Sequence, residues 1–339
     1  MKEVKRHIAL ALAALMLIGT MAACGKSGVT DIHNPADAVS SAQPEDSIME
    51  LSWEMVPLTQ APPVSSILTP TAPGTLTKSN QKAAIDYSNT ADGYVMIKYL
   101  QTTTKELRVR VTGPNSVKYD YRLKSSGEYE VFPLSAGNGS YTIAVFEQIE
   151  GSRYATANSV TATVTLKDEF APFLRPNQYV NFKEDSAVVK KAAELVKGVD
   201  DFYGKVAAVF NFITSTIKYD KDFAAAVGRG EHAGYVPVLD TVLANKKGIC
   251  FDFAAVMTGM LRSQSIPTRL VIGYAGQAYH AWIEVYSEKD GWVSTIQFDG
   301  KSWKLMDPTF MSSATNAAQT EEVMKYIGDG SKYTACYLY

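Results

Sequence analysis

The stretch from Lys246 to Met257 constrains this sequence most, because it places a cysteine at the expected start of a buried helix. Gly248 comes two residues before Cys250, and beyond the cysteine apolar side chains recur at helical spacing. A cysteine in the first turn of a helix faces unpaired backbone N–H groups and the positive end of the helix dipole, which favour a thiolate. Buried structural cysteines are also common. The stretch alone therefore leaves two interpretations open, a nucleophile and a core residue.

A nucleophilic cysteine needs a base and a group that orients the base, and histidine is scarce in this sequence. His280 begins an alternating strand pattern, and Asp307 directly follows another strand pattern. The remaining histidines lie in segments without such a pattern: His7, His33 and His232. A cysteine on a helix N-terminus, a histidine on one strand and an aspartate after the next follow the logic of a Cys-His-Asp acyl-transfer site. In such a site Asp307 holds the imidazole tautomer, His280 draws the thiol proton and Cys250 attacks a carbonyl.

Three separated motifs, in order along the chain, carry a family resemblance. They are the segment 248–254 with its continuation 261–274, then His280-Ala281-Trp282, then Asp307-Pro308-Thr309. Over about residues 185–310 the chain resembles the transglutaminase-like superfamily. The resemblance implies a papain-like α+β fold, in which the helix bearing the cysteine packs on an antiparallel sheet. It also implies that Cys250 is the nucleophile, His280 the base and acid, and Asp307 the orienting group.

Other site residues are less firmly indicated. The Cys250 backbone N–H and the Tyr219 side chain are candidate oxyanion donors. Tyr274 and Trp282 are candidates to line a substrate groove, and a core role is as good an interpretation for each. Asp252, two residues after Cys250, fits a stabiliser of the first helical turn better than a catalyst. The acidic residues are scattered and no EF-hand pattern occurs, so we expect no metal and no cofactor.

We assign residues 168–339 to the catalytic domain. Helices are predicted at 186–196, capped by Ser186, and at 203–217. A flexible, glycine-rich crossing is expected at 223–236. Alternating patterns predict strands after the Cys250 helix, at 268–274, 280–286, 291–293 and 303–306.

Residues 83–167 contain six or seven short alternating runs separated by turn signals, which suggests a small immunoglobulin-like β-sandwich. Its many tyrosines could form a binding face, but half-buried strand positions are commoner for this residue type. We therefore favour a spacer or docking role. Residues 168–182 are too apolar for a flexible linker and are expected to pack between the two domains.

The N-terminus has the features of an export signal. Basic residues precede an apolar run in residues 1–23, and the run ends at Met21-Ala22-Ala23-Cys24-Gly25, which resembles a bacterial lipobox. Lipidation of Cys24 would anchor the chain to the outer face of the bacterial cytoplasmic membrane. An ordinary signal peptide cut nearby is the alternative. Residues 24–82, rich in proline, serine and threonine, are expected to form a flexible tether.

The net charge and the cysteine content limit which partners and disulfides this chain can have. The net charge is −2 and no basic block follows the N-terminus, so nucleic acid is not expected to bind. With Cys24 lipidated, Cys250 and Cys336 would be left, and a disulfide between them would silence the nucleophile. We interpret Cys336 as a strand or tail residue packed on the core. The default oligomeric state is a monomer.

The leading functional hypothesis is a lipid-anchored, cell-surface cysteine enzyme that transfers acyl groups from amides of proteins or peptides through a thioester. The product would be a cross-link or a hydrolysed amide, depending on the acceptor. A non-enzymatic surface module that binds through the β-sandwich is the second hypothesis. Arylamine acetyl transfer uses a related triad but needs acetyl-CoA, which is not expected outside the cell.

Overall fold

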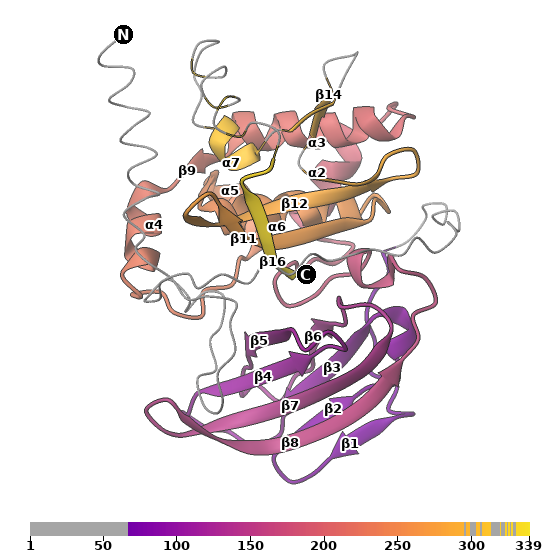
Figure 1. The fold of residues 1–339 in the computed structure, drawn as a ribbon, viewed down its shortest axis with the longest axis vertical. Coiled ribbons are helices and arrows are strands. Elements are labelled where there is room, and N and C mark those ends of the chain that lie inside the picture. The colour runs from indigo at the N-terminus through magenta and orange to yellow at the C-terminus, as the bar shows by residue number, and fades with distance from the viewer. Residues whose placement is uncertain are drawn as a thin grey trace. The chain divides into compact units, whose positions relative to one another are not determined.

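The computed structural model describes residues 67–294, 296–298, 303–305, 307–312, 319, 323, 325, 327 and 330–339. The described chain divides into two compact units (Figure 1). One contains Leu68–Tyr179 and the other Val180–Leu338. The signal peptide, the lipobox with Cys24 and most of the expected tether lie outside the described residues.

The first unit is all-β, with two four-stranded antiparallel sheets. One sheet has the order β1-β2-β3-β6, made of Thr77–Ser79, Ala83–Asp86, Tyr94–Tyr99 and Glu130–Pro133. The other has the order β5-β4-β7-β8, made of Lys118–Arg122, Leu107–Thr112, Gly139–Glu150 and Arg153–Val164. Six of these strands match the alternating runs of the sequence. The short strands β1 and β2 add to them.

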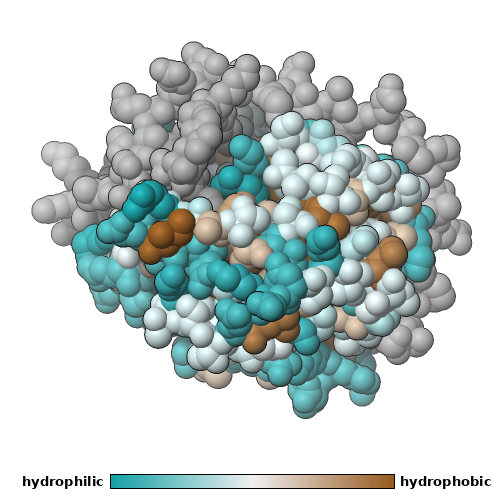
Figure 2. Space-filling model, turned by 90° about the horizontal axis from the view of Figure 1, so that it is seen from below, coloured by the Kyte–Doolittle hydropathy of each residue, from teal (hydrophilic) through white to brown (hydrophobic). Residues whose placement is uncertain are grey.

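Tyrosines fill the core of this unit rather than covering its surface. Tyr94, Tyr99, Tyr119, Tyr121 and Tyr141 are buried. The Tyr141 hydroxyl donates to the backbone oxygens of Gly137 (2.8 Å) and Leu134 (3.2 Å), a tyrosine corner of the kind that immunoglobulin-like sandwiches use. On the face seen in Figure 2, hydrophobic side chains are separated by hydrophilic ones. The burial of the five tyrosines favours a packing role over a binding role for them.

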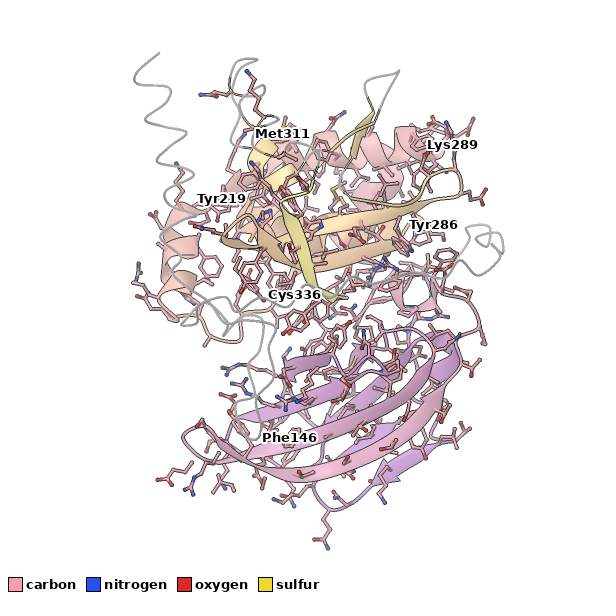
Figure 3. The ribbon with its side chains drawn as sticks, viewed as in Figure 1. Phe146, Tyr219, Tyr286, Lys289, Met311 and Cys336 are labelled. Atoms are coloured by element: carbon pink, nitrogen blue, oxygen red, sulfur yellow. The ribbon has the colours of Figure 1, made fainter. Side chains whose placement is uncertain are left out.

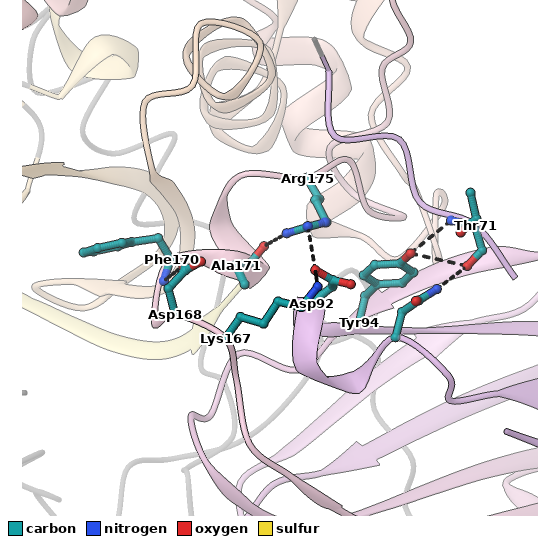
Figure 4. Close-up of polar contacts among 9 residues, drawn as sticks. Thr71, Asp92, Tyr94, Lys167, Asp168, Phe170, Ala171 and Arg175 are labelled. Carbon is teal, nitrogen blue, oxygen red and sulfur yellow. Dashed lines mark hydrogen bonds and ion pairs between the residues drawn. The ribbon is translucent and has the colours of Figure 1, made fainter. Parts of the chain in front are cut away.

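The expected tether ends earlier than residue 82, because residues 68–82 belong to the first unit. The Tyr94 hydroxyl accepts from Thr71 N–H at 3.0 Å, and Asn89 Nδ2 donates to Thr71 O at 2.7 Å (Figure 4). The Asp86 carboxylate accepts from Gly74 N–H. Side chains from elsewhere thus hold a proline-rich backbone that cannot form its own ladder, and sequence periodicity does not register such contacts.

The segment after β8 is ordered, as its apolar content indicated. Phe170, Phe173 and Leu174 are buried. The Arg175 guanidinium donates to Ala171 O and to Asp92 Oδ1, both at 3.0 Å (Figure 4). The first unit therefore extends to Tyr179, twelve residues beyond the predicted boundary at 167.

The second unit contains six helices among its described residues. They are α2 (Ala187–Leu195), α3 (Phe202–Thr216), α4 (Lys221–Gly228), α5 (Leu239–Asn245), α6 (Cys250–Arg262) and α7 (Pro308–Met311). Of these, α2, α3 and α6 begin close to the predicted positions. Ser186 is the N-cap residue of α2, but its side chain makes no cap bond. Instead, the Asp240 carboxylate accepts from Ala187 and Val188 N–H, both at 3.0 Å. The predicted helix start at Ser186 is confirmed, but the expected bond from its side chain was wrong, because a tertiary neighbour supplies the acceptor.

Helix α4 replaces part of the crossing that was expected to be flexible. Asp220 caps it by accepting from Phe223 N–H at 3.0 Å, and alanines fill its centre. The glycines on which the prediction rested lie at its end and beyond it. The prediction of a flexible segment from 223 was therefore wrong for 223–228.

The main sheet of this unit has the order β13-β12-β11-β16 and is antiparallel throughout. Its strands are Gly291–Ser294, Ala278–Ser287, Thr268–Ala275 and Tyr333–Leu338. Helix α6 packs against β11 and β12. Two strand pairs complete the unit: β9 (Lys218–Tyr219) with β10 (Lys247–Gly248), and β14 (Ile296–Phe298) with β15 (Trp303–Leu305). The predicted α+β fold, a cysteine-bearing helix on an antiparallel sheet, is confirmed.

Within the part of the chain that the structure describes, no helix combines the length and the apolar character needed to cross a membrane.

Candidate active site

Cys250 is the first residue of α6, and its side chain is half-buried. Asp252 stabilises this helix start, because its Oδ2 accepts from Ile249 N–H at 2.8 Å. The rest of the helix is buried, so the cysteine lies at the only turn of α6 with partial exposure. The expectation that Asp252 supports the first turn is confirmed.

Gly248 is required by the close approach of Asp252. A Cβ at this position would lie 2.6 Å from Asp252 Cβ, nearer than real Cβ atoms come. Strand β10, which contains this glycine, runs parallel to β9 and sets Tyr219 opposite Gly248. Asp220 N–H donates to Gly248 O at 2.8 Å, which continues the pairing. The chain entering the cysteine helix is thereby fixed against β9.

Asp252 is itself held by a second donor. The Tyr235 hydroxyl donates to Asp252 Oδ1 at 2.5 Å. Burial raises the pKa of Asp252 to about 6, although the hydrogen bonds from Tyr235 and Ile249 oppose the rise. Sequence reasoning missed Tyr235, because it lies in the glycine-rich crossing, where no periodicity marks a side chain.

His280 lies on β12, opposite Gly273 of β11, and is fully buried. Its Nε2 is 2.5 Å from Asp307 Oδ2. The ring stacks on Trp282, with centroids 6.3 Å apart, and packs against Phe310 at 5.1 Å. Apolar neighbours on two sides and one carboxylate bond fix the imidazole plane.

Asp307 is buried and serves two purposes with its two oxygens. As the N-cap of α7, its Oδ1 accepts from Thr309 N–H at 2.9 Å and from Phe310 N–H at 3.4 Å. Its Oδ2 faces His280 and also accepts from the Tyr333 hydroxyl at 3.1 Å. The short helix α7, which was not predicted, is therefore what points the carboxylate at the imidazole.

Charge pairing within the site favours a protonated imidazole. Burial alone would lower the pKa of His280, but the charge and hydrogen bond of Asp307, together with those of Cys250, raise it to about 10. Asp307 occupies Nε2, so a bond to the Cys250 thiol uses Nδ1. Among the described residues Nδ1 has no partner at ordinary hydrogen-bond distance. Cys250 is nevertheless close enough to help raise the pKa of His280, so the imidazole lies within electrostatic reach of the thiol.

Tyr219 lies at the end of β9 (Figure 3). Burial raises the pKa of its phenol, and nearby Cys250, Asp252 and Asp307 raise it further, so the hydroxyl keeps its proton. A neutral phenol near the sulfur and the first N–H groups of α6 can donate to a developing oxyanion.

The two groove candidates differ in position. Trp282 is 2% exposed, so it forms the wall behind His280 and not an open surface. Tyr274 is half-buried at the end of β11, with its ring 5.5 Å from that of Tyr279. Trp282 is therefore a core residue and does not line an open groove.

The structure brings Tyr333 into the site, which sequence reasoning did not foresee. It begins β16, a strand that joins the sheet beside β11 from the far end of the chain. Nothing in the local pattern of the C-terminal run signals that one of its hydroxyls reaches Asp307.

Neither Cys250 nor Cys336 forms a disulfide within the part of the chain that the structure describes, and Cys336 is half-buried on β16 (Figure 3). The prediction of a strand position for Cys336 is confirmed. The sulfur of Cys250 is therefore not blocked by a disulfide.

A cysteine at a helix N-terminus, near a buried histidine that a sheet positions and an aspartate holds, is the arrangement of papain-like cysteine sites. Residues 189–295 match the sequence model of the transglutaminase-like superfamily, a range that contains Cys250 and His280 and ends before Asp307. The chain therefore carries a domain of the transglutaminase-like superfamily, as its motifs suggested.

Individual relatives are distant. Over 118 residues the chain is 30% identical to the uncharacterized protein YebA of Bacillus subtilis, an alignment that covers 29% of this chain and 14% of YebA. The chain thus spans about one seventh of that relative. The periplasmic domain of TgpA from Pseudomonas aeruginosa is 15% identical, with 74% of this chain and 98% of that chain covered and a TM-score of 0.31. Red sea bream transglutaminase is 14% identical, with 68% and 53% covered and a TM-score of 0.26.

Proposed function

We propose that this protein is a cysteine acyl-transfer enzyme that attacks an amide of a protein or peptide and passes the acyl group to water or to an amine. The observation that carries the proposal is the buried His280, which Asp307 holds at Nε2 and whose pKa the neighbouring Cys250 helps to raise. This arrangement supports a nucleophile with a matched proton carrier.

In the first half-reaction the Cys250 thiolate attacks the amide carbon, and the carbonyl electrons move to oxygen. The resulting oxyanion would accept from the Cys250 backbone N–H and from the Tyr219 hydroxyl. When the oxyanion collapses, the C–N bond breaks and the imidazolium of His280 gives its proton to the leaving nitrogen. A thioester and a neutral imidazole remain.

In the second half-reaction the neutral imidazole accepts a proton from water or an incoming amine, which attacks the thioester. The C–S bond breaks and the thiolate and imidazolium are restored. Water gives a carboxylate and an amine gives a new amide, so hydrolysis and cross-linking differ only in the acceptor.

The direct test uses a thiol-reactive amide probe on the purified protein. We expect labelling at Cys250 that His280→Ala abolishes, located by mass spectrometry of the digested protein. Incubation with a protein mixture would then reveal new termini, from hydrolysis, or cross-links with loss of ammonia. Absence of labelling, or labelling that His280→Ala leaves unchanged, contradicts the proposal and favours the binding-module hypothesis.

Tyr219→Phe tests the oxyanion role separately. Since the ring is retained and only the hydroxyl is lost, we expect amide turnover to fall by roughly tenfold to a hundredfold. Alkylation of Cys250 by iodoacetamide, which forms no tetrahedral oxyanion, should be nearly unchanged. Equal loss in both reactions would contradict the role.

For the cellular location we propose export with a lipid anchor on Cys24, which rests on the lipobox-like sequence alone. The first unit would then be a spacer or docking domain. Metabolic labelling with a palmitate analogue should mark the wild-type chain and fail with Cys24→Ser. Equal labelling of both would leave an ordinary signal peptide as the better account.

A further inference from the structure

Tyr333, the first residue of β16, contacts Asp307 by a hydrogen bond and lies with its ring close to His280 and Trp282. Its hydroxyl donates to Asp307 Oδ2 at 3.1 Å, the oxygen that also faces His280 Nε2. Its ring stands edge-on to Trp282 at 5.2 Å and lies 6.3 Å from the His280 ring. Tyr333 is thus packed and hydrogen-bonded on the same side of the sheet as the imidazole.

A β-bulge in β16 sets this orientation. Tyr337 lies opposite Ile272, but the next pair is Ala335 with Gly273, so Cys336 is an extra residue between them. Residues paired across strands share a face, and Gly273 is opposite His280. The bulge therefore puts Tyr333 on the face of His280 while Tyr337 takes the other face.

Gly273 is adapted to the bulge. A Cβ there would come within 2.0 Å of Thr334 O and 2.9 Å of the Trp282 ring. Backbone closeness of this kind needs glycine. The strand pairing, the bulge and the glycine together place the Tyr333 hydroxyl where it meets Asp307.

The chemistry of the pair explains what the hydroxyl can do. Asp307 Oδ1 is bound by two backbone N–H groups, whereas Oδ2 receives His280 and Tyr333. Once His280 has given up its proton, Asp307 is a buried carboxylate next to a neutral ring. A buried charge is tolerated when hydrogen bonds satisfy it, and the phenol supplies one that remains after the proton has left.

We propose that Tyr333 is a positioning residue of this site, whose hydroxyl shares Asp307 Oδ2 with His280 and stabilises the carboxylate while the imidazolium donates its proton to the leaving amine. The proposal rests on the function proposed above. Tyr333 acts through Asp307 and touches no reacting atom.

Several titratable side chains surround the His280 imidazole and can influence its pKa. Helix α6 contributes Cys250, the start of α7 contributes Asp307 and β16 contributes Tyr333. Tyr219 on β9 lies near Cys250 and Asp307. The neighbouring rings of Trp282 and Phe310 carry no charge at any relevant pH.

The experiment measures the pKa of His280 by NMR in the full chain labelled with ¹⁵N-histidine, with the signal assigned from His280→Gln. In Tyr333→Phe the Asp307 charge is no longer shared, so the pKa of His280 should rise by roughly one unit. In the Asp307→Asn background the same substitution should change it by much less, since Tyr333 acts through that carboxylate. Tyr337→Phe, which removes a hydroxyl from the opposite face of the same strand, is the matched control and should shift nothing.

An unchanged or lowered pKa of His280 in Tyr333→Phe, or a shift of equal size in the Asp307→Asn background, would overturn the positioning role. A change in thermal stability with no shift in the titration would mean that Tyr333 only packs. The titration needs no substrate, so it decides the role of Tyr333 even if the protein fails to label with an amide probe. Failure to label would count against the proposed acyl transfer alone.

Discussion

At the residue scale, Asp307 joins the fold to the chemistry. One carboxylate oxygen caps α7 and the other faces His280, so the position of a four-residue helix determines the orientation of the imidazole. Because Asp307 both caps α7 and binds His280, even an isosteric substitution should alter the site.

Asp307→Asn tests this dependence. The amide can still cap α7 through its oxygen, but its NH₂ then faces His280 Nε2 and disfavours the tautomer with Nε2–H. We expect the rate of Cys250 alkylation at pH 7 to fall by roughly tenfold or more, while the folded structure persists. The measurement is iodoacetamide modification followed by mass, with circular dichroism as the control for folding. An unchanged rate would mean that Asp307 only caps the helix.

Protonation of His280 should also appear in stability. Its pKa is raised to about 10, above the ordinary value of 6.5, so the folded chain holds a proton that the unfolded chain releases. This contribution is fully present below about pH 6.5 and is lost as pH rises towards 10, with a slope of up to about 1.4 kcal/mol per pH unit. Urea unfolding of the wild type and of His280→Gln from pH 6 to pH 10 should give curves that converge as pH rises. Curves that stay parallel would show that His280 carries no such proton.

At the element scale, the start of α6 depends on the fit between Gly248 and Asp252. The glycine leaves the space that the Asp252 side chain fills while it accepts from Ile249 N–H. The start of α6 therefore depends on the contact between Gly248, which precedes the helix, and Asp252 in its first turn.

Gly248→Ala should break that fit. The added methyl must displace Asp252, so we expect a loss of about 1–3 kcal/mol in unfolding free energy and slower Cys250 alkylation. Lys247→Ala on the same strand is the matched control, because its exposed contact with Asp220 should contribute little. Equal stability of the two variants would show that the entry to α6 can relax around the methyl.

Elements with strong periodicity were predictable, and elements fixed by distant partners were not. The spacing of apolar residues located α3, α6, β11 and β12. Helices α4 and α7 are short and depend on the caps Asp220 and Asp307, and a single cap residue is a weak signal in sequence. The acceptor for the first turn of α2 comes from Asp240, which lies about fifty residues further along the chain.

At the scale of the whole molecule, the chain has two compact units, and the segment after β8 belongs to the first of them. The Asp92 carboxylate holds this segment through Arg175 and Lys167. The segment should therefore behave as part of a folded domain and not as a linker.

Limited proteolysis with chymotrypsin tests this assignment. Because Phe170 and Phe173 are buried, we expect little cleavage after them in the wild-type chain and faster cleavage in Asp92→Ala, which removes the ion pair with Arg175. Glu150→Ala, which removes an exposed ion pair with Arg153, is the control and should not accelerate cleavage. Rapid cutting of the wild type at these positions would refute the assignment.

The sequence by itself determined the fold class of each unit and singled out Cys250, His280 and Asp307 as candidate site residues, because each lies next to a strong local pattern in a chain with few histidines. Only the tertiary structure decided that Tyr333 and Tyr235 bind the carboxylates of Asp307 and Asp252. The physical reason is that a side-chain hydrogen bond depends on which strands and loops meet. Local periodicity records burial along one element, and it carries no information about the partner that a distant part of the chain supplies.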